Sequence, residues 1–122
     1  MKSPYKGKTG IRRLINAFKY SVAGTFAAFK HEDAFRQEVI LSTILIPLAL
    51  YLGQTAIEQA LMITSILLII IVELLNSSVE ATVDRISVKR HKLAKRAKDI
   101  GSAAVFFSLI NAVVIWFLIL VK

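Results

Sequence analysis

Residues 61–85, LMITSILLIIIVELLNSSVEATVDR, contain the pattern that decides the fold of this chain. No residue in 61–72 is charged, so the segment begins as a stretch suited to a membrane span. Polar side chains then recur on one face of the same predicted α-helix, at Glu73, Asn76, Glu80 and Asp84. The segment is therefore predicted to be a membrane helix with a polar stripe along its second half.

The depth of the stripe favours a functional role for it. A charged side chain at the centre of a bilayer costs about 2.5–3.5 kcal/mol, and less toward the surfaces. At ~1.5 Å per residue, Glu73 lies roughly 18 Å along the helix from Arg85, well inside the hydrocarbon layer. A single polar residue there would be explained by helix–helix contact alone. Three carboxylates and an amide on one stripe instead indicate a site with chemistry.

Composition limits the classes of protein that remain. The 122 residues suit one domain, and 56% of them are hydrophobic, with a mean hydropathy of +0.63. The net charge is +8, and the basic residues flank long apolar runs, which favours a membrane partner over nucleic acid. The chain has no cysteine, so disulfides, Cys-ligated zinc and thiol catalysis are excluded.

The rest of the chain is predicted to be helical and to form one membrane domain. We expect a flexible tail at 1–10, an amphipathic helix on the membrane surface at 11–31, and spans at 34–53, 56–84 and 97–121. An alternative for 11–31 is a helix packed on a soluble partner. Pro47 is placed to kink the first span, and Trp116 suits an interfacial anchor in the last. No cleaved signal peptide is expected.

Basic residues predict the orientation in the membrane. No Lys or Arg occurs between Arg36 and Arg85, whereas the connection between the second and third spans is rich in them. The positive-inside rule therefore places the N-terminus and this connection in the cytoplasm, with the polar stripe opening to the same side of the cytoplasmic (inner) membrane. The basic residues of this connection are Arg85, Lys89, Arg90, Lys92, Lys95, Arg96 and Lys98.

The same side of the membrane would gather groups suited to phosphoryl transfer. Two acidic sets are expected to meet there, Glu32 with Asp33 and Glu38, and Glu80 with Asp84. Carboxylates at an aqueous boundary suit Mg²⁺ bound together with substrate phosphates. The basic segment 95–98 is either a solvated loop or a site that neutralises a polyphosphate, and His91 is either a solvated residue or a nucleotide contact.

Glu73 is too deep to hold a soluble nucleotide, but it suits a base that accepts a proton from a lipid hydroxyl. These features together predict phosphoryl transfer from a nucleotide to a lipid alcohol.

Three segments carry a resemblance to a known family: 73–86 (ELLNSSVEATVDRI), 96–105 (RAKDIGSAAV), and Glu32 followed by 34–38 (AFRQE). Over about residues 12–116 the chain closely resembles the small prokaryotic integral-membrane diacylglycerol kinases. The resemblance implies an all-α membrane protein with a surface helix and three spans. It also implies a homotrimer, with active sites between subunits.

The resemblance also implies roles for individual residues. Glu73 would be the catalytic base toward diacylglycerol, and Glu32 and Glu80 would hold Mg²⁺. Contacts with ATP, the co-substrate, fall to Arg13, Tyr20, Glu32, Glu80, Lys89, Arg90, His91, Lys98 and Asp99. Substrate or supporting roles fall to Arg13, Ala34, Phe35, Arg36, Glu38, Asn76 and Ser102. Segment 87–91 is more basic than the enterobacterial pattern of the family, and Lys95 replaces a small residue.

The product implied is phosphatidic acid, in phospholipid recycling, and no nucleic acid partner is expected. Two alternatives remain beside it. A branch of the same family phosphorylates undecaprenol, and the physical pattern does not distinguish the two lipids, although the motifs at 35–38 and 84–86 favour diacylglycerol. From another class, a small oligomeric proton-coupled transporter would also place a glutamate inside a span.

Overall fold

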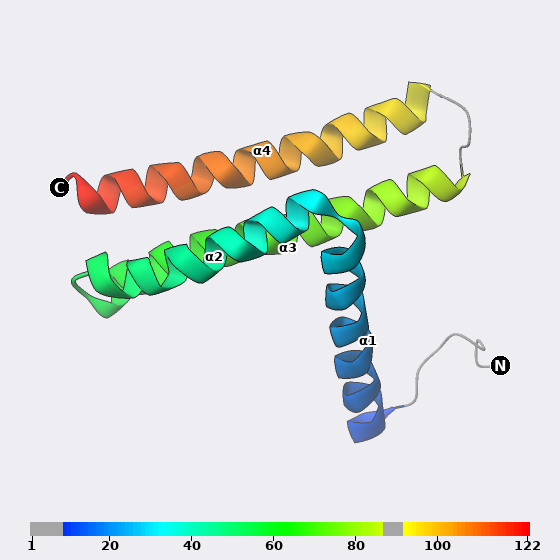
Figure 1. The fold of residues 1–122 in the computed structure, drawn as a ribbon, viewed down its shortest axis with the longest axis horizontal. Helices are drawn as coiled ribbons and strands as arrows, with labels where there is room; N and C mark the ends of the chain where they lie inside the picture. Colours follow the sequence, from blue (N-terminus) through cyan, green and yellow to red (C-terminus); the bar gives the residue numbers. More distant parts are fainter. Residues whose placement is uncertain (1–8, 87–91) are drawn as a thin grey trace.

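The computed structural model describes residues 9–86 and 92–122, which form four α-helices (Figure 1). Helix α1 spans Gly10–His31, α2 spans Asp33–Leu52, α3 spans Ala56–Ile86 and α4 spans Lys92–Leu120. The described residues contain no strand, so the predicted all-α class is confirmed. Helices α2, α3 and α4 are each long and apolar enough to cross a membrane, as three predicted spans require.

Two parts of the predicted organisation lie outside the described residues. They are 1–8, which is most of the predicted tail, and 87–91, which contains Lys89, Arg90 and His91. Beyond the second gap, α4 begins at Lys92, five residues before the predicted start of the last span. The basic residues from Lys92 to Lys98 therefore lie on a helix rather than in a loop.

Helix α3 is the centre of the fold. It packs most extensively on α4, next on α2, and it also touches α1. Helices α2, α3 and α4 run alongside one another, whereas α1 leaves the other three and crosses their direction (Figure 1). The core lies between α3 and α4, and partly buried side chains of α2 and α4 cover it; it consists of Ile66, Ile69 and Ala112, with Leu45, Ile46 and Trp116 packed against them.

This core is small because most large apolar side chains face outward. Phe107 and Phe117 on α4 are 67% and 60% exposed, and similar residues cover α2 and α3. Helix α1, which is described throughout, has no buried residue in the single chain. Surfaces of this kind suit contact with lipid or with further protein chains, since a protein in water rarely exposes so much apolar area. The chain is an integral membrane protein.

Hydrogen bonds fix the turn between α2 and α3. Thr55 Oγ1 accepts from the backbone N–H of Glu58 at 3.1 Å, and Glu58 Oε1 accepts from the N–H of Gln54 at 3.0 Å, in the manner of a capping box. The Gln59 side-chain amide donates to the carbonyl of Leu50 at 3.0 Å. Glu58 also pairs with Lys122, so the end of α4 is attached to the start of α3.

Trp116 packs into the bundle instead of serving only as the predicted interfacial anchor. Its indole Nε1 donates to Ser65 Oγ at 3.1 Å and to the carbonyl of Met62 at 3.3 Å, which connects α4 to α3. Ser65 and Met62 are both fully buried. The sequence places an aromatic residue near the end of the span but does not show which way its ring turns.

Trp116→Phe is expected to destabilise the protein by about 1–2 kcal/mol, because the donor to α3 and part of the ring are lost. The measurement is the thermal unfolding midpoint in detergent micelles. Phe117→Leu, at the neighbouring outward-facing position, is the control and should change the midpoint much less. An unchanged midpoint for Trp116→Phe would contradict this structural role.

Candidate active site

Glu73, in the second half of α3, is 4% exposed and is the only charged side chain so enclosed among the described residues. Its carboxyl group interacts electrostatically with those of Glu80 on the same helix and Glu32 at the junction of α1 and α2. It also interacts with Glu38 on α2. Four carboxyl groups from three parts of the chain therefore gather around one buried position.

Asn76 connects this carboxylate cluster to α4. Its Nδ2 donates to Glu80 Oε1 at 3.0 Å, one turn along α3. The same amide lies against Gly101 of α4, where an added Cβ would collide with Asn76 Oδ1 and lie 3.2 Å from its Cγ. Helix α4 can approach this closely only because residue 101 has no side chain. Gly101 therefore determines where the Asn76 amide, and through it Glu80, is held.

Gly101→Ala is expected to lower both stability and activity. The new methyl group occupies the position of the Asn76 amide oxygen, so the amide must turn away from Glu80 or α4 must move outward. Overpacking of this kind costs about 1–3 kcal/mol. Thermal unfolding measures the cost, and in an Asn76→Ala background the same change should cost much less. Equal costs in the two backgrounds would contradict the proposed contact.

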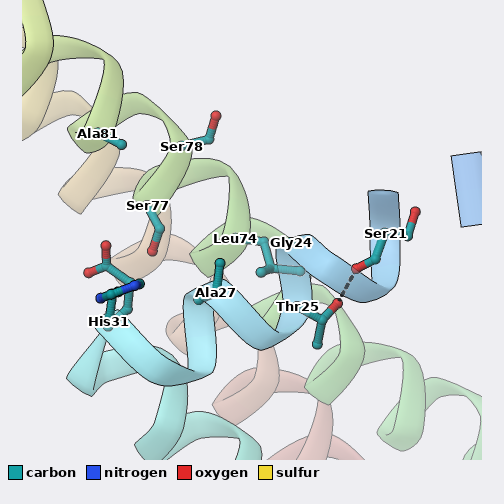
Figure 2. A pocket seen from close by; sticks show the side chains of 11 residues that line it. Ser21, Gly24, Thr25, Ala27, His31, Leu74, Ser77, Ser78 and Ala81 are labelled. Carbon is teal, nitrogen blue, oxygen red and sulfur yellow. Dashed lines mark hydrogen bonds between the residues drawn. The ribbon is translucent and has the colours of Figure 1, made fainter. Parts of the chain in front are cut away.

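A cavity of about 590 Å³ lies between α1 and α3, beside the carboxylate cluster. Figure 2 shows α1 along one side of it and the Leu74–Ala81 part of α3 along the other. Small side chains form most of its walls, with Glu32 and His31 at the end of α1; the lining residues are Ser21, Gly24, Thr25, Ala27, Ala28, His31, Glu32, Leu74, Ser77, Ser78 and Ala81. The cavity is open on one side, as a site for a lipid headgroup region would be.

Three buried polar atoms near the cluster have no hydrogen-bond partner among the described residues. They are Glu38 Oε2, Asn76 Oδ1 and Ser77 Oγ. Leaving a buried polar group unpaired costs about 1–3 kcal/mol, so such groups are rare unless something else satisfies them. Their concentration within one region indicates a place where a ligand or another chain contributes the missing partners.

Arg36 holds the junction between α1 and α2. Its Nη1 donates to the carbonyls of Phe29 and Lys30 at 2.8 Å, which caps the end of α1, and its Nη2 pairs with Asp33. The side chain thereby fixes how α1 meets α2. Since α1 forms one wall of the cavity, Arg36 is a positioning residue for the site.

Two lysines at the basic start of α4 are paired with carboxylates. Lys98 Nζ lies 2.6 Å from Asp84 Oδ1 on α3, and Lys95 Nζ lies 2.7 Å from Asp99 Oδ2 one turn along α4. A shallow hollow of about 390 Å³ lies beside these residues, lined by Lys92, Lys95, Arg96, Asp99, Ile100 and Ala103. Asp33 and Asp84 are thus engaged in ion pairs. Glu32, Glu38 and Glu80 each interact electrostatically with Glu73 instead.

The other predicted site residues within the described segments differ in how exposed they are in the single chain. Arg13 and Tyr20 are exposed on α1, Ala34 is exposed on α2, and Ser102 is exposed on α4. Phe35 is 1% exposed and packs inside the protein. Lys89, Arg90 and His91 lie outside the described residues.

The carboxylates suit a metal bound together with its phosphates, not a closed metal cage. Among residues 9–86 and 92–122, no three His, Asp or Glu side chains converge as ligands of one ion. In kinase-type sites Mg²⁺ is held by one or two carboxylates plus substrate phosphates, so two carboxylates are sufficient. Glu80, oriented by Asn76, and Glu32, at the cavity wall, have the oxygen donors that this ion prefers.

Sequence reasoning assigned no role to Ser77 or Gly101. Ser77 is four residues after Glu73 and so shares a face with it, a spacing that could have singled it out. The importance of Gly101 depends on its register against Asn76, and no pattern within α4 alone reveals that register.

Comparisons with known proteins give a consistent result. Residues 19–120 match the family described as prokaryotic diacylglycerol kinase. A diacylglycerol kinase of Pseudomonas aeruginosa is 56% identical over 118 residues, covering 97% of this chain and 96% of the relative. One of Haemophilus influenzae is 55% identical over 108 residues, covering 88% and 92%. One of Escherichia coli is 46% identical over 112 residues, covering 92% of each.

Proposed function

The chain belongs to the prokaryotic diacylglycerol kinase family, and we propose that it transfers the γ-phosphoryl group of ATP to the free hydroxyl of diacylglycerol. The products are phosphatidic acid and ADP. The observation that carries this proposal is the buried carboxyl group of Glu73 on a membrane helix, which interacts electrostatically with the carboxyl groups of Glu32, Glu38 and Glu80. A purely structural protein would have no use for that arrangement.

Glu73 acts as the general base. Its carboxylate accepts the proton of the lipid hydroxyl as the hydroxyl oxygen forms a bond to the γ-phosphorus. The bond between that phosphorus and the β–γ bridging oxygen breaks, and ADP leaves with the electron pair. The depth of Glu73 in the membrane helix suits a substrate that arrives from the bilayer.

Glu32 and Glu80 would hold the magnesium ion of the nucleotide. When bound, Mg²⁺ neutralises the phosphate charge. The hydrogen bond from Asn76 keeps Glu80 oriented, and Gly101 leaves the space that Asn76 needs. Glu38 and Ser102 support the site, together with the junction formed by Ala34, Phe35 and Arg36.

The ATP contacts are assigned to residues from separate parts of the chain. Lys98 and Asp99 contribute from the start of α4, with Lys89, Arg90 and His91 from the preceding segment. Arg13 and Tyr20 are exposed on α1 and would reach a nucleotide bound to another subunit. This separation, with the wide apolar surfaces of α1 to α4, supports a homotrimer with sites shared between subunits. The protein part of the complex in mild detergent should have a mass of three times 13.6 kDa.

We infer that the protein lies in the cytoplasmic membrane, with its N-terminus and active site on the cytoplasmic side. The distribution of Lys and Arg supports this orientation, because they are absent between Arg36 and Arg85. Cytosolic ATP and membrane diacylglycerol can both reach such a site.

The proposed function is tested by measuring phosphatidic acid formation in mixed detergent–lipid micelles. Purified protein should form it from diacylglycerol and ATP when Mg²⁺ is present, and EDTA should stop the reaction until Mg²⁺ is added back. Failure of the folded protein to form any phosphatidic acid would contradict the proposal.

A further inference from the structure

The hydroxyl group of Ser77 differs from those of the other buried serines. Among the described residues three serines are buried, Ser65, Ser77 and Ser108. Ser65 Oγ donates to the carbonyl of Met62 at 2.7 Å, and Ser108 Oγ donates to the carbonyl of Val105 at 2.6 Å. Such bonds back to the preceding turn are the usual way for a helical serine to satisfy its hydroxyl.

Ser77 makes no such bond, although its backbone is equally helical. It is 8% exposed, and its Oγ has no partner among the described residues. It lines the cavity between α1 and α3, and Figure 2 shows its hydroxyl directed from α3 toward the His31 end of α1. The other hydroxyl groups on the α1 wall are satisfied locally: Ser21 donates to Ala17 and Thr25 to Ser21. Among the described residues that line the cavity, Ser77 therefore has the buried hydroxyl group that is available to donate a hydrogen bond to a ligand.

We propose that this cavity receives the glycerol and ester region of the acceptor lipid, and that the Ser77 hydroxyl donates a hydrogen bond to one of its ester carbonyls. The inference rests on the proposed function and specifies how the acceptor is recognised. It makes Ser77 a specificity-determining residue for a diacyl lipid, in addition to the base Glu73.

The position of Ser77 fits this role. It lies about one helical turn from Glu73, or roughly 6 Å along α3, on the same face of the helix. In diacylglycerol the free hydroxyl and the nearest ester are on adjacent carbons, so a lipid whose hydroxyl reaches Glu73 carries its ester close to Ser77. An ester carbonyl can only accept a hydrogen bond, and a hydroxyl that does not bond to its own helix is the matching donor.

The walls of the cavity are also suited to this part of a lipid. Apart from the hydroxyl groups, and His31 and Glu32 at the end of α1, they consist of small and apolar side chains, with Ala27 on α1 and Leu74 and Ala81 on α3. In an apolar cavity, a small number of polar groups is enough to fix the orientation of a ligand and the specificity of the site. A polyprenol has a hydroxyl but no ester, so it would gain nothing from Ser77.

The test compares two acceptors that differ only in whether their chains carry ester carbonyls. One is a diacylglycerol with short ester-linked chains, and the other is the dialkylglycerol with the same chains in ether linkage, which lacks the carbonyl oxygens. Wild-type protein should prefer the ester by about fivefold in kcat/KM, the value of one neutral hydrogen bond. Ser77→Ala should reduce this ratio to about one, because activity on the ester falls much more than activity on the ether.

Two further variants and a stability measurement complete the test. Ser77→Thr keeps the donor and should keep the preference for the ester, and Ser108→Ala, which removes an equally buried but satisfied hydroxyl, should also keep it. The thermal unfolding midpoint of Ser77→Ala should not fall, because an unpaired buried group is removed.

An equal loss on both acceptors, or a lower midpoint without a change in the ratio, would overturn the inference while leaving the kinase activity in place. If the wild-type protein phosphorylated neither acceptor, the proposed function and this inference would both be rejected.

Discussion

Glu73→Gln should abolish phosphoryl transfer, lowering kcat by about 10³-fold or more, while nucleotide affinity stays near that of the wild type. Removing a positioned general base typically costs 10²–10⁴-fold in rate. The amide has nearly the same shape as the carboxylate, so the lipid still fits, but it cannot accept the proton of the hydroxyl. The nucleotide is assigned to Glu80 and Glu32, which the substitution leaves intact.

Stability gives an independent readout for Glu73. The residue is 4% exposed and makes no ion pair among the described residues. Replacing a buried carboxylate by an amide removes a desolvation penalty, so the thermal midpoint should stay the same or rise. Glu73→Asp retains a carboxylate and should keep measurable activity. If Glu73→Gln retained more than about a tenth of the wild-type rate, Glu73 would not be the base.

Glu80→Gln should weaken the binding of Mg-ATP by about 100-fold, with a smaller effect on the lipid KM. Mutating a residue that hydrogen-bonds to a metal ligand lowers metal affinity by about 10–100-fold. Losing the ligand itself is expected to lower the affinity at least as much. The remaining amide oxygen is a neutral and weaker ligand for Mg²⁺ than a carboxylate. Because Asn76 donates to Glu80 Oε1, the substitution also disturbs the partner that orients it.

The measurement is a titration of Mg-ATP at saturating lipid, with direct nucleotide binding in parallel. Glu58→Gln is the matched control, since it removes the same charge from the opposite end of α3, where Glu58 pairs with Lys122. That variant should lose stability but not nucleotide affinity. Unchanged Mg-ATP affinity in Glu80→Gln would remove Glu80 from the metal role.

The sequence predicts much of this fold because lipid solvation imposes simple patterns. Three membrane spans are predicted from three uncharged runs, which lie before Gly53, around 61–72 and after Asp99. Helices α2, α3 and α4 contain these runs. The spacing from Glu73 to Glu80 places both on one helix face, and the two carboxyl groups interact in the structure. Features that depend on one helix alone are therefore readable from periodicity.

Features that depend on the register between helices could not be predicted. The contact of Gly101 with Asn76 and the hydrogen bonds of Trp116 to α3 both require two helices to meet at a particular height. The free hydroxyl of Ser77 is recognised only by comparison with Ser65 and Ser108, whose rotamers direct their hydroxyls to the backbone. Composition and spacing contain no information about these choices.

The central claim is that this membrane protein phosphorylates diacylglycerol, and labelled phosphate transfer tests it most directly. Label from Mg-ATP would be followed in mixed micelles that contain diacylglycerol or undecaprenol in parallel, with wild-type protein and Glu73→Gln. The account predicts label in phosphatidic acid with the wild type, little in undecaprenyl phosphate, and none with the variant. Label in undecaprenyl phosphate alone would contradict the assigned acceptor, and label in neither lipid would contradict the kinase function itself.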